Sequence, residues 1–264
     1  MDDILLKPIG IVHSDTDDAL KKMPLGGEKA IIEVFPDYHE ALQGIEENSH
    51  IWVLAWFHKA ERDILKIVPK KVNPDFPEYG VFALRAFNRP NPIGMCLAAL
   101  ERVEGNLLHV SGLDAIGGTP VLDIKPYFEK DIVFSPKTSY IKGKDRAMRY
   151  EFIFEQAMVH HGEDCRDLYL ASRMAAIAED ELGKLNDEAL TVAVKGSSCL
   201  ADCIQGITKA RLANPARFTY ENSEGPGETQ WGKNNMAITL KAKRKFSREE
   251  VKELSDKQLF TISK

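Results

Sequence analysis

The chain has 264 residues, of which 44% are hydrophobic and 28% charged, and its net charge is −5. These values are ordinary for a globular protein and exclude disordered, collagenous and coiled-coil chains. The negative net charge also excludes a protein that is basic overall, so any contact with nucleic acid has to come from a local basic cluster. The longest apolar run, at residues 51–57, has the length of a strand and predicts no membrane span. Because the first residues are acidic rather than basic, we expect no secretory signal and a cytoplasmic protein.

The first half of the chain, to about residue 127, consists of short β-branched or aromatic runs separated by Gly, Pro or Asn. Such runs predict strands, here at residues 9–13, 30–35, 51–57, 80–84, 96–103 and 107–110. One short helix is expected after Pro36, because Asp37 and Glu40 have the spacing of a capping box. Many short strands with one helix predict a small all-β barrel. With about eight strands, such a barrel fills its interior with side chains and leaves its rim for a ligand.

A boundary is predicted at residues 128–144, which are polar and are interrupted by Pro136 and Gly143. We therefore expect an N-terminal domain at residues 1–135, a linker at 136–147 and a second domain at 148–264. In the second domain the hydrophobic period becomes that of helices, over residues 146–160, 164–182 and 198–209. A further helix is expected after Ser247, and strands at 191–194 and 236–240. The C-terminal domain is thus predicted to be α+β.

Two segments of the first half carry the candidate chemistry. In Arg89-Pro90-Asn91-Pro92-Ile93-Gly94, the prolines fix a rigid loop that exposes the Asn91 amide, and Gly94 allows a ligand or a neighbouring strand to approach closely. In the segment at 118–127, Asp123 and Lys125 alternate with apolar residues, so they share one face of a strand. An acid and a base on one face can bind a zwitterion, a ribose hydroxyl or an amine. Tight barrel corners with a surface ion pair explain the pattern equally well.

Together these segments, Arg-Pro-Asn-Pro-Ile-Gly and Gly-Thr-Pro-Val-Leu-Asp-Ile-Lys-Pro-Tyr, resemble the signature of the TsaA-like family, also called TrmO. The resemblance extends over residues 5 to about 130. It implies a small β-barrel that binds S-adenosylmethionine and works as a homodimer, with the cofactor at or near the subunit interface. The substrate that it implies is tRNA, methylated on N6 of N6-threonylcarbamoyladenosine at position 37, next to the anticodon.

The resemblance also implies site residues in this chain. The target nitrogen is urea-like and weakly nucleophilic, so its proton has to be removed with help. The candidates for this role are Asp123 and Tyr127, with His58 third. The segment that begins at Met23 lacks the Arg and Gln that many relatives have there. The implied cofactor-binding residues are Met23, Pro24, Leu25, His58, Lys59, Arg85, Asn91, Met95, Leu122, Asp123, Ile124 and Lys125.

Three of the four cysteines lie in the C-terminal half, together with a histidine at a suggestive spacing. His161 and Cys165 precede one predicted helix, and Cys199 begins another, with Cys203 one turn later. A helix N-terminus is expected to lower the thiol pKa of Cys199. We interpret His161, Cys165 and Cys199 as a metal site for zinc or another transition metal. Buried thiols that fill a helix contact are the alternative, favoured for Cys203.

This half resembles the FmdE family, named after the molybdenum formylmethanofuran dehydrogenase operon, over residues 150 to about 225. The family pattern His-Gly-His-x-Cys is matched at residues 161–165, with Glu163 in place of the second His, where a carboxylate can still ligate. The later pattern Ser-Cys-x-x-Asp-x-Ile-Gln-x-x-Thr is matched at residues 198–208. The zinc-ribbon extension of the family is absent from the sequence.

The leading interpretation is a tRNA methyltransferase barrel fused to an FmdE-like module. One alternative is a protein of anaerobic C1 metabolism that binds S-adenosylmethionine and metal and has a non-tRNA acceptor; another is a non-catalytic sensor. A basic run beside Phe246 favours nucleic acid, because clustered cations near an aromatic ring suit phosphates and bases. A solvated strand end explains the run equally well. The candidate tRNA contacts are Arg89 and the basic run, which comprises Lys241, Lys243, Arg244 and Lys245.

Overall fold

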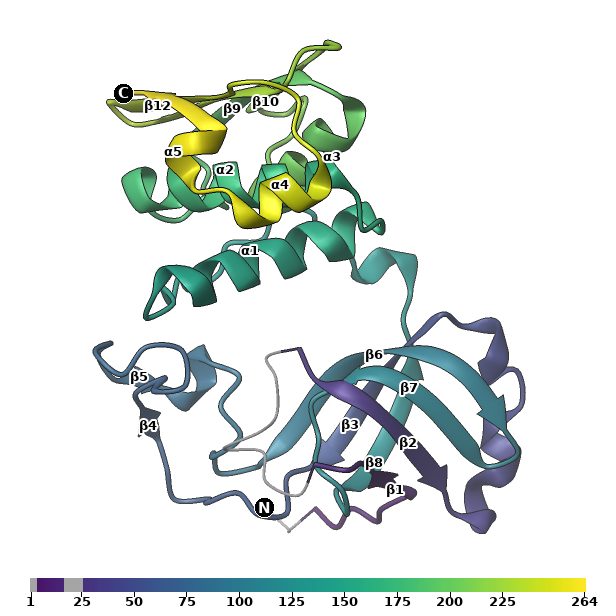
Figure 1. The fold of residues 1–264 in the computed structure, drawn as a ribbon. Coiled ribbons are helices and arrows are strands. Elements are labelled where there is room, and N and C mark those ends of the chain that lie inside the picture. Colours follow the sequence, from purple (N-terminus) through teal and green to yellow (C-terminus); the bar gives the residue numbers. More distant parts are fainter. Residues whose placement is uncertain (1–3, 17–25) are drawn as a thin grey trace. The chain divides into compact units, whose positions relative to one another are not determined.

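The computed structural model describes residues 4–16 and 26–264, which form two compact units (Figure 1). Unit 1 contains the chain up to Val68 and Glu78–Ile132. Unit 2 contains Pro69–Pro77 and Val133–Lys264. Within the described ranges, no helix is long and apolar enough to cross a membrane.

Unit 1 is a closed antiparallel barrel with the strand order β1-β2-β7-β6-β3-β8. Side chains alternate between its interior and its surface: on β3, Ile51, Val53 and Ala55 are fully buried. The predicted small all-β barrel is confirmed, with six strands instead of eight. The six strands are β1 (Gly10–His13), β2 (Glu28–Val34), β3 (His50–Trp56), β6 (Ile93–Glu104), β7 (Leu107–Leu113) and β8 (Pro120–Pro126).

The strand predicted at residues 80–84 is wrong. Only Tyr79–Gly80 (β5) is extended there, paired with Lys66–Ile67 (β4), and the chain then turns into a 3-10 helix, η3 (Val81–Ala83). The helix expected after Pro36 is also of the 3-10 type, η1 (Pro36–Leu42). Two further 3-10 turns are η2 (Ile45–Glu47) and η4 (Glu129–Asp131).

Unit 2 is an α+β domain, as predicted, in which helices pack on a five-stranded sheet of order β10-β9-β11-β12-β13 (Figure 1). Strands β9 and β10 are parallel, and the other pairs are antiparallel. Its core includes Leu168, Met174, Ile204 and Trp231, each almost fully buried. The elements are α1 (Arg146–His161), α2 (Arg166–Leu182), β9 (Leu190–Gly196), α3 (Ser198–Thr208), β10 (Phe218–Asn222), β11 (Glu228–Lys233), β12 (Met236–Ala242), α4 (Arg248–Glu253), α5 (Asp256–Leu259) and β13 (Phe260–Ser263).

The segment Pro69–Pro77, which lies between β4 and β5 in the sequence, belongs to unit 2. The Lys144 amide donates a hydrogen bond to the Val72 carbonyl (3.0 Å), and the Asn73 side-chain amide donates one to the Lys142 carbonyl (3.2 Å). These long-range bonds explain why a segment inside the sequence range of the predicted N-terminal domain folds with the C-terminal unit. The domain limits at residues 135 and 148 remain predictions.

Candidate functional site

Two strands, β8 and β6, carry predicted cofactor residues on the outer surface of the barrel, and β3 lies between them. The strand register places Asp123 of β8 opposite Leu54 of β3, and Leu54 opposite Met95 of β6. One step along, Lys125 lies opposite Trp52. Asp123 and Lys125 share the outer face, as expected, and their charged groups lie 2.8 Å apart in an exposed ion pair. We call this surface of β8, β3 and β6 the outer face.

An apolar row on β6 lies on the other side of β3 from this ion pair. Ile93, Met95 and Leu97 alternate along the strand with 37%, 51% and 38% of their surface exposed. Trp52 and Trp56 of β3 lie opposite Leu97 and Ile93. Contiguous apolar side chains on a surface are typical of a place where a ligand or another chain binds.

Tyr127 extends the outer face by one position beyond β8. Its backbone amide donates to the His50 carbonyl (3.1 Å), which continues the strand pairing. Its ring lies 6.2 Å from that of Trp52 and 6.4 Å from that of His50. Positions 123, 125 and 127 therefore place the two candidate proton acceptors, Asp123 and Tyr127, on the same surface.

The remaining predicted cofactor residues of unit 1 lie mainly in two loops that the structure brings together. His58 and Lys59 are exposed in the turn after β3, and Arg85 and Asn91 are exposed in the loop before β6. Hydrogen bonds join these loops: Phe57 N–H to the Pro92 carbonyl (2.8 Å), Glu61 N–H to Asn88 Oδ1 (2.9 Å), and Arg62 Nε to the Pro90 carbonyl (3.0 Å).

Two further predicted cofactor residues lie on β8 outside the exposed ion pair, and three cannot be placed. Leu122 and Ile124 are half-buried on β8, and Ile124 packs against the barrel core. Met23, Pro24 and Leu25 lie outside the described residues.

Arg89, a predicted tRNA contact, holds its own loop together. Its Nε donates to the Ala86 carbonyl (2.7 Å), and its Nη2 donates to the carbonyls of Val81 (2.9 Å) and Leu84 (2.6 Å). These bonds satisfy carbonyls that do not enter a sheet. The structure thus gives Arg89 a structural role, and its contact with tRNA remains a prediction.

Gly94 begins the inward-facing positions of β6 next to the Phe57 ring. A Cβ atom built on Gly94 would lie 2.3 Å from a carbon of that ring, far inside van der Waals contact. The close approach predicted at Gly94 is therefore made by a side chain that follows the neighbouring strand, β3. The contact packs the start of β6 against the loop that carries His58.

In unit 2, three helix ends converge on the predicted metal ligands. His161 is the last residue of α1, Cys165 is the N-cap of α2, and Cys199 lies in the first turn of α3. One ligand atom from each lies within 4.8 Å of the other two. The structure thus brings together the three residues that the sequence singled out. Both thiols lie at helix N-termini, where the helix dipole favours negative charge.

Two glycines make this convergence feasible. Gly162 ends α1 in the left-handed conformation (φ 72°), and its amide donates to the Met158 carbonyl (2.8 Å). The chain then turns back, so that Cys165 returns towards His161. Gly206 lets α3 approach α1 closely, since a Cβ there would lie 2.6 Å from the Cβ of His160.

Asp202 is a residue of this cluster that the sequence did not single out as a site residue. Its Oδ2 lies 2.7 Å from His161 Nδ1, while His161 Nε2 lies 3.3 Å from the Cys165 sulfur. A signal was present in the sequence: Asp202 follows Cys199 by three residues, so a helix places both on one face.

The structure bears on three expectations about the cluster. Burial, the neighbouring Cys165 and the carboxylates of Asp167 and Glu163 raise the pKa of the Cys199 thiol, opposite to the lowering that was expected at a helix N-terminus. Glu163 is exposed, and its carboxylate is not within the group of ligand atoms. Cys203 is fully buried, which fits the packing role favoured for it.

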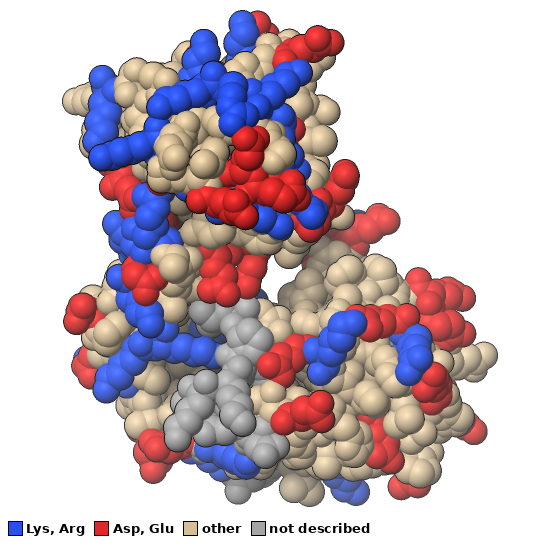
Figure 2. Space-filling model, viewed as in Figure 1, with Lys and Arg blue, Asp and Glu red and all other residues tan. Residues whose placement is uncertain are grey.

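The basic run lies at the end of β12 and beyond it, among acidic side chains, and Figure 2 shows the two charges mixed across this face of unit 2. Lys241 pairs with Glu228 (3.5 Å) and Arg244 with Glu250 (2.6 Å). The expectation that Phe246 stacks on a nucleic-acid base is wrong, because this residue is only 7% exposed and belongs to the core. Its ring instead lies 4.2 Å from the Arg244 guanidinium.

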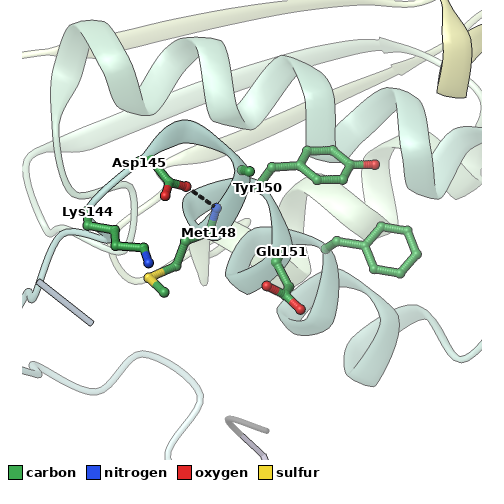
Figure 3. Close-up of a pocket in the computed structure, with 7 residues that line it drawn as sticks. Lys144, Asp145, Met148, Tyr150 and Glu151 are labelled. Atoms are coloured by element: carbon green, nitrogen blue, oxygen red, sulfur yellow. Dashed lines mark hydrogen bonds between the residues drawn. The ribbon is translucent and has the colours of Figure 1, made fainter. Parts of the chain in front are cut away.

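A shallow, mostly apolar groove runs along the first turns of α1 (Figure 3). The carboxylate of Asp145, which lines the groove, caps α1 by accepting a hydrogen bond from the Met148 backbone amide (2.9 Å). No predicted site residue lines this groove, so we place the candidate sites on the outer face and at the cysteine cluster. The groove is lined by Lys144, Asp145, Ala147, Met148, Tyr150, Glu151 and Phe154.

Comparison with known proteins matches each half of the chain to a family model. Residues 20–131 match the tRNA-methyltransferase O N-terminal domain, and residues 160–260 match FmdE, Molybdenum formylmethanofuran dehydrogenase operon. A crystal structure of TrmO from Pseudomonas aeruginosa is 34% identical in sequence and has a TM-score of 0.43 to this chain. The match covers 53% of this chain and 64% of the TrmO chain.

Three relatives illustrate the similarity. A probable S-adenosyl-L-methionine-binding protein of Methanothermobacter thermautotrophicus is 44% identical over 130 residues, which are 48% of this chain and 92% of the relative. A protein of the same name from Archaeoglobus fulgidus is 35% identical over 222 residues, 80% of this chain, which spans 60% of that relative's length. The tRNA (adenine(37)-N6)-methyltransferase of Mus musculus is 47% identical over 96 residues, 36% of this chain and 22% of the relative. The chain therefore belongs to the TrmO family, and it carries an FmdE domain in its C-terminal half.

Proposed function

We propose that the protein is an S-adenosylmethionine-dependent methyltransferase that methylates N6 of N6-threonylcarbamoyladenosine at position 37 of tRNA. Relatives of the barrel half are named for S-adenosylmethionine binding and for methylation of adenine 37 of tRNA. The observation that carries the proposal is the outer face, where the ion pair of Asp123 and Lys125 on β8 and the apolar row of β6 lie on either side of β3.

The outer face fits the chemical groups of S-adenosylmethionine. The Lys125 ammonium suits a carboxylate, the Asp123 carboxylate suits an ammonium or a ribose hydroxyl, and the row with Met95 and Leu97 suits an adenine ring. The side chains of Lys125 and Asp123 are 62% and 46% exposed, so their ion pair adds little to folding stability, about 0–1 kcal/mol. Both charges are thus available to a ligand.

S-adenosylmethionine supplies, when bound, an electrophilic methyl group on a sulfonium. The chain's own part is to align the two reactants and to accept the proton that N6 loses. Asp123 and Tyr127 are the proposed acceptors, because they share the outer face, with His58 third. Asp123 Oδ1 accepts the Ile124 amide (2.9 Å) and Oδ2 faces Lys125, which fixes the orientation of this carboxylate.

A second copy of the chain is the proposed cover for the outer face. The row of Ile93, Met95 and Leu97 is one-third to one-half exposed, and an open barrel surface cannot exclude water from a methyl transfer by itself. A homodimer that buries this row would shield the ligand. Small-angle scattering that gives a monomer mass for an active sample would contradict this part of the proposal.

In unit 2, we propose a centre for zinc or a similar transition metal at His161, Cys165 and Cys199. One imidazole nitrogen and two sulfurs are donors that zinc prefers, and their spacing within 4.8 Å suits a common ion. Three protein ligands leave one tetrahedral position for an outside ligand. This cluster favours the second candidate function, a protein of anaerobic C1 metabolism with a non-tRNA acceptor; a non-catalytic sensor is the third.

Methyl transfer with purified components tests the proposal. The full chain is incubated with methyl-labelled S-adenosylmethionine and tRNA that carries threonylcarbamoyladenosine, with tRNA lacking this modification as the control. We expect label only in the modified tRNA. Binding of S-adenosylmethionine without label in either tRNA would reject the tRNA assignment and favour the other two candidates.

A further inference from the structure

We propose that Asp202 is a positioning residue, which holds His161 in the orientation and tautomer that metal binding requires. The inference rests on the metal centre proposed above. Asp202 lies on α3, and its carboxylate reaches two consecutive histidines at the end of α1. Oδ2 lies 2.7 Å from His161 Nδ1, and Oδ1 lies 3.3 Å from His160 Nε2.

The short contact fixes which nitrogen of His161 carries the proton. An ionised carboxylate only accepts hydrogen bonds, so Nδ1 has to donate. In the neutral imidazole, Nε2 is then unprotonated and presents its lone pair on the side of Cys165, whose sulfur lies 3.3 Å away. This tautomer is the one in which Nε2 ligates a metal, and carboxylate–histidine pairs of this kind orient metal ligands.

The surroundings separate this role from a contribution to folding. The side chain of His161 is 8% exposed and that of Asp202 is 44% exposed. The Asp202 carboxylate is partly exposed, and the approach of α3 to α1 depends on Gly206 packing against His160. Removal of the Asp202 carboxylate should therefore release the imidazole without separating the helices.

Cobalt titration of the metal-free full-length protein tests the proposal. Asp202→Ala removes the acceptor, and Asp202→Asn keeps an oxygen that can accept from Nδ1. His160→Ala is the matched control, because it removes the other contact of the carboxylate and keeps the Cβ, one of the three His160 atoms nearest to Gly206. Thermal unfolding of each variant checks that the fold is intact.

We expect Asp202→Ala to bind cobalt 10- to 100-fold more weakly, Asp202→Asn to recover part of the loss, and His160→Ala to bind within about threefold of the wild type. At saturation, the sulfur-to-cobalt charge-transfer band of Asp202→Ala should keep its intensity while the d–d bands change, since only the histidine ligand is disturbed. Unchanged affinity in Asp202→Ala, or an equal loss in His160→Ala, would overturn the proposal.

A second readout needs no metal. The ¹⁵N chemical shifts of the His161 imidazole should show a proton on Nδ1 in the wild type and a mixture of tautomers in Asp202→Ala. Identical shifts in both proteins would overturn the role of Asp202. If the wild type bound no cobalt while the tautomer still depended on Asp202, the metal centre would fail and the positioning role would stand.

Discussion

Replacing Gly94 with alanine tests how the loop beside the outer face is held. The added Cβ would lie 2.3, 2.7 and 2.8 Å from three atoms of the Phe57 ring, so the ring has to retreat by roughly 1 Å to reach ordinary contact. Phe57 packs against the barrel core, which leaves little room. Overpacking of this kind costs about 1–3 kcal/mol. Because the Phe57 amide bonds the Pro92 carbonyl, we also expect weaker binding of S-adenosylmethionine.

Denaturant unfolding, followed by tryptophan fluorescence, measures the cost, since two of the chain's three tryptophans lie on β3. Gly80→Ala is the matched control: Gly80 has φ −60° and ψ 138°, and a Cβ there meets nothing within 4 Å. We expect this control to be neutral or more stable by about 0.4–1 kcal/mol. Combining Phe57→Leu with Gly94→Ala should recover part of the loss, as expected for residues in contact. If Gly94→Ala matched the control, the packing of the ring on Gly94 would be refuted.

Three further predictions concern the chemistry. Loss of a general base costs about 100- to 10,000-fold in rate, so Asp123→Asn or Tyr127→Phe should show a loss of this size, and full methyl-transfer rates in both would exclude both residues. Cys165→Ser and Cys199→Ser should lose metal, while Cys203→Ser should retain it. Metal uptake by the wild type should release protons and weaken at low pH, because the ligands have to be deprotonated. Equal metal content in all variants would place the metal elsewhere. Alanine at all four positions of the basic run should weaken tRNA binding. Two of the four cations are already paired with carboxylates, so the magnitude of the slope of log affinity against log salt should fall by roughly 2. An unchanged slope would exclude the basic run from the tRNA contact.

Local patterns in the sequence were enough for most of the barrel. A strand with one buried face alternates in hydrophobicity, so runs such as residues 51–57 identify strands without knowledge of their partners. Residues 80–84 have strand composition but lack a barrel partner, and Arg89 satisfies carbonyls in that loop instead. Strand pairing depends on distant parts of the chain, which composition does not report.

The same distinction holds at the candidate sites. His161, Cys165 and Cys199 could be grouped because each lies at a predicted helix end, and alternation alone placed Asp123 beside Lys125. Tertiary contacts decided what the sequence could not. Burial and the neighbouring charges raise the pKa of Cys199, opposite to the expected shift, and the core takes up the Phe246 ring that was expected to stack on a base.

Nucleoside mass spectrometry of tRNA tests the central claim most directly. Total tRNA is compared from cells with the gene, cells without it, and cells complemented with the wild type or with Asp123→Ala. The proposed function predicts that the N6-methylated form of threonylcarbamoyladenosine disappears with the gene, returns with the wild type and stays reduced with Asp123→Ala. An unchanged amount of the methylated nucleoside in cells without the gene would contradict the claim that this protein methylates tRNA.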